Sequence, residues 1–168
     1  MINNKNKSKG FTIIEVMIVL AIAGLIMLIV FLAVPALQRQ ARNTQRKNDA
    51  GNVASAISTW ISNNNGALPG QTGVNGATCD SDLKSAINGV NLGYYKSGNV
   101  SCVTSMPSVC QTSGVCTTGY LSTENMFLLE GYICQGNTPQ TTGATTRSYV
   151  LLYAVETGAS PSEQCIEG

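Results

Sequence analysis

Residues 9–37 read KGFTIIEVMIVLAIAGLIMLIVFLAVPAL, and this stretch decides the fold. From Val16 to Leu37 it contains no charged or strongly polar side chain. An α-helix needs about 20 consecutive apolar residues to span the hydrocarbon core of a bilayer. The stretch is long enough for that, and it exceeds the roughly 7–15 apolar residues of an ordinary secretory signal peptide.

Basic residues flank the apolar stretch on both sides. Lysines before it favour a cytoplasmic N-terminus, but the basic residues after it leave the orientation open on charge alone. They are Lys5, Lys7 and Lys9 before the stretch and Arg39, Arg42, Arg46 and Lys47 after it. The second group could bind anionic headgroups or acids on neighbouring chains, or it could form a solvated helix face.

The cysteines resolve the orientation. All six follow the apolar stretch, at Cys79, Cys102, Cys110, Cys116, Cys134 and Cys165. An even number in a small polar region indicates disulfides formed outside the cytosol, so this part of the chain is expected outside. Structural zinc is the alternative, but it favours close Cys/His pairs, and the chain has no histidine and no C-x-x-C. We therefore expect no metal.

The region from residue 50 onward is acidic and lacks a catalytic motif. Three basic residues face seven acids there, a net charge of about −4, so DNA binding is not evident. Without histidine or G-x-S-x-G, we expect no enzyme, no catalytic residue and no cofactor. Asp80 and Asp82 are spaced like part of a calcium loop, but no acidic partners complete one. We expect them to cap or solvate a short helix.

After Leu37 the pattern stays helical and becomes amphipathic. Apolar residues recur at spacings of three and four, and Asn63-Asn64-Asn65-Gly66 favours a helix end. We predict one helix from Phe11 to about Asn63, with local bending or unwinding at Gly24 and Pro35. The apolar stripe that should pack on the outer domain is Ala50, Val53, Ala54, Ile57, Trp60 and Ile61.

The rest of the chain predicts a small sheet. Residues 66–125 are rich in turn formers, with a short helix near Ser81–Asn88 and room for short strands. Two segments have strand composition, Asn125–Cys134 and Ser148–Glu156, and residues 136–147 connect them. We expect them to form an antiparallel sheet against the amphipathic half of the long helix.

Glu15 is the residue that a plain membrane anchor does not need. A carboxylate costs about 2–3 kcal/mol at the membrane centre and less near the edge, so an acid in a spanning segment indicates a function. If the chain were cut after Gly10, Phe11 would carry a charged amine one helical turn from Glu15. Glu15 could then neutralise its own amine or a neighbour's. The alternative is that Glu15 reaches the headgroups.

The segment Lys9–Glu15, with its apolar run, resembles the class III signal of type IV prepilins and pseudopilins. The match covers Lys9 to about Leu37, roughly a sixth of the chain. The resemblance implies that a prepilin peptidase cuts between Gly10 and Phe11 and methylates Phe11, and that Glu15 guides assembly. It also implies an α+β, lollipop-like fold, with a long N-terminal helix on a small antiparallel sheet, and a Cys134–Cys165 disulfide. The other cysteines would form two further bonds of undetermined connectivity.

The implied function is a structural subunit of a surface filament, with four segments. They are a cleaved leader (1–10), a membrane and fibre-core half-helix (11–37), an amphipathic half-helix (38–63) and an extracellular head (64–168). The implied partners are the membrane, prepilin peptidase, an assembly platform with its ATPase, other copies of the chain, and host or bacterial surfaces. The alternatives are a minor pilin or pseudopilin of a secretion or competence machine, and a membrane-anchored binding module.

Overall fold

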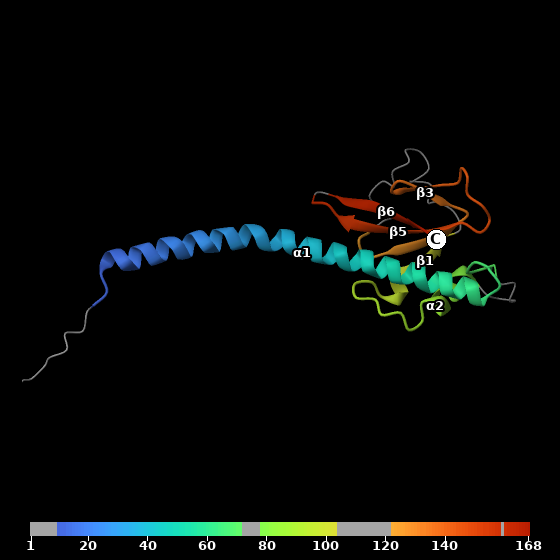
Figure 1. Cartoon of the computed structure of the whole chain (residues 1–168), viewed down its shortest axis with the longest axis horizontal. Coiled ribbons are helices and arrows are strands. Elements are labelled where there is room, and N and C mark those ends of the chain that lie inside the picture. Colours follow the sequence, from blue (N-terminus) through green and yellow to red (C-terminus); the bar gives the residue numbers. More distant parts are fainter. Residues whose placement is uncertain (1–9, 72–77, 104–121, 159) are drawn as a thin grey trace, which may run out of the picture. The chain divides into compact units, whose positions relative to one another are not determined.

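The computed structural model describes residues 10–71, 78–103, 122–158 and 160–168 (Figure 1). The chain divides into two compact units, Met1–Gln40 and Ala41–Gly168, and the first helix runs through both. The helices are α1 (Ile13–Asn63), α2 (Cys79–Ala86) and the 3₁₀ turn η1 (Ser97–Asn99). The strands are β1 (Val100–Val103), β2 (Met126–Glu130), β3 (Ile133–Gln135), β4 (Thr138–Gln140), β5 (Tyr149–Glu156) and β6 (Pro161–Glu167).

Helix α1 confirms the predicted long helix. It ends where Asn65 and Gly66 take left-handed backbone angles, with φ of 56° and 80°, conformations that Asn and Gly tolerate. The Gly66 N–H donates to the carbonyl of Ile61 at 2.9 Å, which satisfies one of the last carbonyls.

The unwinding predicted at Gly24 and Pro35 does not occur in this structure, because α1 is helical through both positions. Proline removes one backbone donor from the helix, and the surrounding turns are sufficient to keep the segment helical. The Nε–H of Arg39 donates to the Pro35 carbonyl at 3.4 Å. A change at these two positions on assembly stays a prediction.

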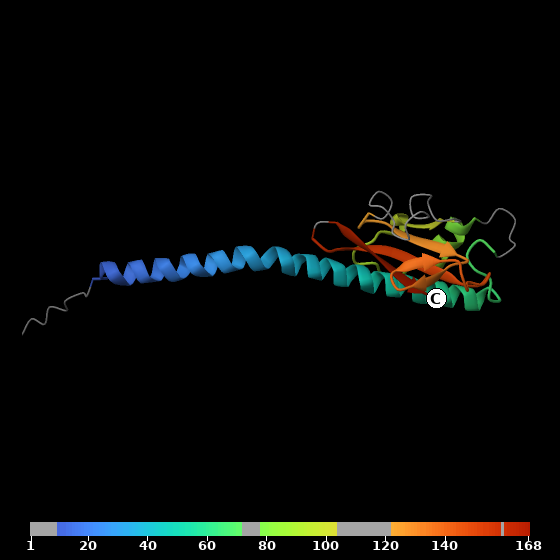
Figure 2. The ribbon, with the colours of Figure 1, turned by 90° about the horizontal axis from the view of Figure 1, so that it is seen from above.

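The main sheet has four strands in the order β1-β2-β5-β6. Strands β2, β5 and β6 pair antiparallel, as predicted for the first two. Strand β1 pairs with β2 in parallel, which makes the sheet mixed. The C-terminal half of α1 lies along one face of this sheet (Figure 2). The predicted α+β class, a long helix packed on a small sheet with disulfides, is therefore confirmed.

Three details of the predicted strands were wrong. The segment Asn125–Cys134 splits into β2 and β3, because Gly131 turns the chain with a φ of 71°. Residues 136–147 contain β4, which pairs with β3 in a separate hairpin. Strand β6 was not predicted, since its sequence PSEQCIE lacks the apolar signal of a strand. The predicted short helix near Ser81–Asn88 is confirmed as α2, with its start two residues earlier.

The core lies on both faces of the sheet. Alternate residues of β2 and β5 pack against the apolar stripe of α1, as predicted for all of the stripe except Trp60, which is half-buried outside this cluster. The buried residues of the cluster include Ala50, Val53, Ile57, Met126, Leu128, Tyr149, Leu151 and Tyr153. The other face buries a smaller cluster, Leu129, Val150, Leu152 and Ala154. Each fully buried Val, Leu or Ile contributes about 1.5–3 kcal/mol relative to exposure. The stripe of α1 is therefore a principal stabilising contact of this unit.

Among the described residues, each face of the sheet has one disulfide. Cys79 of α2 is bonded to Cys102 of β1, and Cys102 lies opposite Leu128 in register. Cys134 of β3 is bonded to Cys165 of β6, which is the pair that the resemblance implies. In both pairs the Cα atoms are 5.8 Å apart. Cys110 and Cys116 lie outside the described residues.

Candidate functional site

The first turn of α1 is closed by a reciprocal cap between Thr12 and Glu15. The backbone N–H and the hydroxyl of Thr12 donate to Oε2 of Glu15 at 2.8 and 2.7 Å. The backbone N–H of Glu15 in turn lies 3.4 Å from the Thr12 hydroxyl oxygen. This is a capping box, in which residues at the N-cap and three positions later satisfy each other's free donors. Glu15 thus caps the start of α1, a role that was not predicted from the sequence.

Phe11 and Glu15 lie close together at the start of α1. They line one open pocket together with Val16, Val19 and Leu20. Gly10 and Phe11 precede the helix and are exposed, and no atom lies within 4 Å of the position of a Cβ at Gly10. The bond between Gly10 and Phe11 therefore lies outside the helix and is exposed. A cut there would create an amine one residue before the Thr12 N–H that already contacts Glu15.

The apolar stretch of α1 is exposed along its whole length. Its large side chains are between 40% exposed, at Val34, and 82% exposed, at Ile13. By length and composition α1 is the helix, among the described residues, that could cross a membrane. An apolar surface of this extent needs cover from lipid or from another protein.

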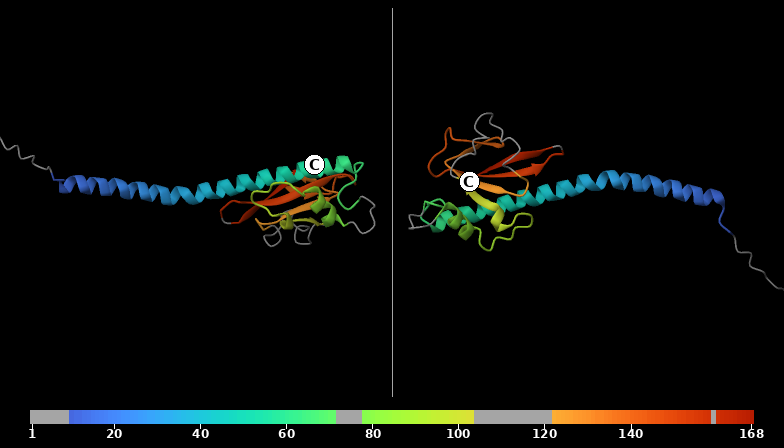
Figure 3. Two further views of the ribbon diagram at one scale, coloured as in Figure 1. Left: turned by 90° about the horizontal axis from the view of Figure 1, so that it is seen from below. Right: turned by 180° about the vertical axis from the view of Figure 1, so that it is seen from behind.

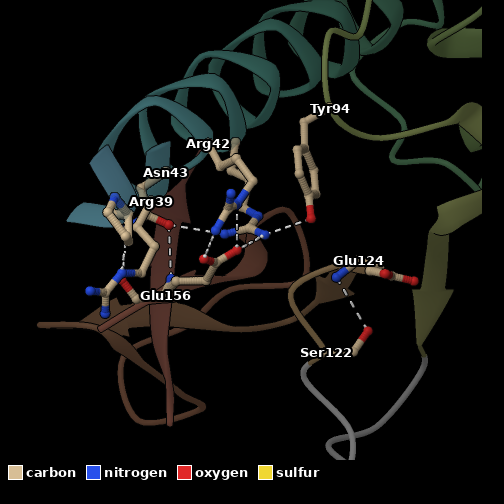
Figure 4. A network of polar contacts seen from close by, with 9 residues as sticks. Arg39, Arg42, Asn43, Tyr94, Ser122, Glu124 and Glu156 are labelled. Atoms are coloured by element: carbon tan, nitrogen blue, oxygen red, sulfur yellow. Dashed lines mark hydrogen bonds and ion pairs between the residues drawn. The ribbon is translucent and has the colours of Figure 1, made fainter. Parts of the chain in front are cut away.

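A charged cluster lies in the second unit, where α1 meets the end of β5 (Figure 4). Arg42 binds both carboxylate oxygens of Glu156, at 3.0 and 2.6 Å. Nη2 of Arg46 lies 2.6 Å from Oε1 of the same carboxylate. The side chain of Asn43 pairs with the backbone N–H and carbonyl of Glu156, each at 2.8 Å. We call Arg42, Asn43, Arg46 and Glu156 the helix–strand anchor.

Arg46 is the centre of this anchor. Its side chain is fully buried, its guanidinium lies 4.1 Å from the ring centroid of Tyr94, and its Nη2 donates to the Tyr94 hydroxyl at 2.6 Å. The hydrogen bonds from Arg42 and then Arg46 lower the pKa of Glu156 to about 2. The anchor is therefore charged throughout the ordinary pH range.

Asp49, one turn further along α1, fixes the segment between α2 and β1. Its buried carboxylate accepts the backbone N–H groups of Gly93, Tyr94 and Tyr95 at 2.9, 2.7 and 2.9 Å. Figure 3 shows this segment beside the C-terminal half of α1. Three backbone donors on one carboxylate make a strong, charge-assisted attachment.

Most of this arrangement was not predicted from the sequence. Arg42 and Arg46 pair with an acid of their own chain, and not with the headgroups, neighbouring chains or solvent considered for the basic group. The sequence did contain a signal for these buried charges. Arg46 lies four residues before Ala50, and Asp49 lies four residues before Val53, so both charged residues continue the apolar stripe of the helix. Charges on a buried stripe need partners.

Asp80 and Asp82 have a different role from the one predicted. Thr78 is the cap of α2. Asp80 accepts the backbone N–H of Cys102 at 2.6 Å, and Asp82 accepts that of Gly70 at 2.8 Å. Both acids therefore attach neighbouring segments to α2.

Comparison with known proteins identifies the N-terminal segment. A family model, the prokaryotic N-terminal methylation motif, matches residues 5–31. That motif is the class III signal of type IV pilins, and here it extends into the apolar first part of α1. No curated protein and no solved structure matches the chain. The motif supports a likeness to type IV pilins and pseudopilins over these residues, and it does not distinguish between the two.

Proposed function

We propose that this protein is a pilin, the structural subunit of a type IV pilus-like surface filament. The precursor crosses the cytoplasmic membrane once, with residues 1–10 inside. Prepilin peptidase cuts between Gly10 and Phe11 and methylates the new N-terminus. An assembly platform driven by a cytoplasmic ATPase then moves the subunit into a homopolymer, whose heads support adhesion, motility or DNA uptake.

The exposed apolar stretch behind the methylation motif is the observation that supports this proposal most. Its side chains have no cover in the single chain. Lipid covers them before assembly, and the same helices of neighbouring subunits cover them afterwards. A head-to-tail contact of this kind does not close on itself, so it produces a filament.

Glu15 supplies the polar contact in this assembly. A carboxylate moved from lipid into a helix bundle stays buried, and an unpaired buried charge costs several kcal/mol. The amine of Phe11, on the same or a neighbouring subunit, is the partner that we propose.

A minor pilin or pseudopilin is the second candidate. It carries the same motif and would be processed in the same way, but it would be scarce relative to the main subunit of the filament. The amount of this chain in purified filaments separates the two. A membrane-anchored binding module is the third candidate, and it would keep residues 1–10.

The capping box gives a sharp test of the role of Glu15. Glu15→Gln keeps a side chain that closes a capping box but removes the charge. Thr12→Val keeps the charge and removes the hydroxyl of the cap. Both variants are expressed with the native assembly machinery, and sheared filaments and membranes are probed for the processed chain. We expect Glu15→Gln to be cleaved but to stay in the membrane, and Thr12→Val to enter filaments.

The opposite pattern would contradict the proposal. If Glu15→Gln assembles normally and Thr12→Val does not, Glu15 acts only as a helix cap. Gly10→Val is the control for processing, because a branched side chain at the proposed cut site should hinder cleavage. It should leave the precursor intact in the membrane.

A further inference from the structure

The Cys79–Cys102 disulfide has a carboxylate beside one of its sulfur atoms. Oε1 of Glu130, the last residue of β2, lies 3.1 Å from Sγ of Cys79. All three side chains are partly buried. The Cys134–Cys165 pair differs, because the carboxylate near it, Glu167, reaches the backbone N–H of Cys134 at 3.4 Å.

Glu130 is held in place by the segments around it. Nε2 of Gln71 lies 3.2 Å from Oε2 of Glu130 and 3.3 Å from the Thr146 carbonyl. Asp82 is the charged neighbour on α2, and Tyr149 faces Glu130 across the β2–β5 pair. Oε2 of Glu130 thus contacts Gln71, and Oε1 faces Sγ of Cys79.

The surroundings raise the pKa of Glu130. Burial has the largest effect and Asp82 adds to it, while the hydrogen bond from Gln71 acts in the opposite direction. An unperturbed thiol has a pKa of about 8.5, and a base transfers protons best when its own pKa approaches the working pH. Glu130 is therefore a better proton acceptor for a thiol than an exposed glutamate.

Cys79 is the better nucleophile of the pair. It is the first residue of α2, directly after the capping residue Thr78. The free N–H groups of a helix start favour a negative charge, and thiolates are stabilised at this position. The proton that Cys79 loses has Glu130 as its nearest carboxylate among the contacts described for this sulfur.

We propose that Glu130 accepts the proton of Cys79 when the Cys79–Cys102 bond forms, and returns it when the bond breaks. The oxidant is a low-molecular-weight disulfide such as oxidised glutathione, which first forms a mixed disulfide with Cys102. The Cys79 proton passes to Glu130, the Cys79 thiolate attacks Sγ of Cys102, and the bond to glutathione breaks. Two protein thiols are oxidised, and one glutathione disulfide is reduced to two thiols.

The reverse reaction starts from the folded protein and is the cleanest test. The full chain in detergent is treated with dithiothreitol at several pH values, quenched with acid and alkylated with isotope-coded reagents. Peptide mass spectrometry then follows each cysteine separately. We expect Glu130→Gln to slow reduction of Cys79–Cys102 by about tenfold, below the roughly 10²–10⁴-fold that is typical of general acid–base catalysis. Cys134–Cys165 in the same molecule should be unaffected.

Two further variants separate proton transfer from a structural effect. Glu130→Asp keeps an acid and should restore part of the rate, and Glu167→Gln is the matched control beside the other disulfide. In wild type, the rate of reduction of Cys79–Cys102 plotted against pH should show an inflection that Glu130→Gln lacks. The rate of reoxidation by oxidised glutathione should show the same difference. Equal rates and pH profiles for wild type and Glu130→Gln, or an equal slowing of both disulfides, would overturn the proposal.

Discussion

Arg46 shows how a charge is accommodated inside this small domain. It is fully buried, and its charge is balanced by Glu156 and by the face of Tyr94. Among the described residues its Nε has no hydrogen-bond partner, so the site already carries one unsatisfied donor. Losing the carboxylate would leave a buried cation with only neutral neighbours, which is more costly than losing an exposed ion pair.

Replacing Glu156 by Gln should therefore destabilise the domain by about 2–3 kcal/mol. Removing one partner of a fully buried pair costs about 3–5 kcal/mol, and the 24% exposure of the Glu156 side chain reduces this. Urea unfolding of the full chain in detergent, followed by the fluorescence of Trp60, the single tryptophan, measures the change. Glu124→Gln, at an exposed glutamate, is the matched control and should change stability little.

The same carboxylate predicts a pH dependence. The pKa of Glu156 is about 2 in the folded chain, below its ordinary value of 4.5. A lowered pKa means that the folded state binds fewer protons than the unfolded state. The stability from the anchor should be complete above about pH 4.5 and lost as the pH falls toward 2. Unfolding free energies between pH 2 and 6 should show this loss for wild type and a flatter profile for Glu156→Gln.

At the scale of elements, α1 combines two kinds of helix. Its first part is apolar all round and exposed, and its second part has one buried stripe. Both patterns are periodic or uniform over many residues, and for that reason the sequence predicts them well. The capping box, Arg46 and Asp49 depend on single contacts with residues near or far in the chain, which periodicity does not reveal.

The strands were harder to predict for specific reasons. Strand β5 is continuously apolar and was found, whereas β6 is an edge strand with polar residues and was not. Gly131 interrupts a segment that reads as one strand, since composition does not show where a glycine takes a positive φ. The Cys79–Cys102 pair could not be selected either, because four cysteines allow three pairings.

Asp49 is the contact that attaches the segment 93–95 to α1. Asp49→Asn turns one of its acceptor oxygens into a donor that faces backbone N–H groups. We expect a loss of about 2–4 kcal/mol, from unpaired buried donors and a lost charge-assisted bond. Hydrogen exchange of the amides of Gly93, Tyr94 and Tyr95 should rise in this variant. Asn48→Ala, at the exposed neighbouring position, is the control, and equal exchange in both variants would contradict this role for Asp49.

At the scale of the whole molecule, the chain joins a structured domain to a helix that lacks cover. The domain holds its own core, the Cys79–Cys102 and Cys134–Cys165 disulfides and the helix–strand anchor. The apolar part of α1 is exposed in the part of the chain that the structure describes, and most of it lies within the methylation motif. This division fits a subunit that folds its head alone and completes its helix contacts in a membrane or in a filament.

The most direct test of this account is the mass of the chain in sheared, unreduced surface filaments. The account predicts a mature chain that begins at methylated Phe11 and lacks residues 1–10. Its abundance then separates a main subunit from a minor one. A chain that still begins at Met1 and is found only in membranes would contradict the account, and would leave a plain membrane anchor.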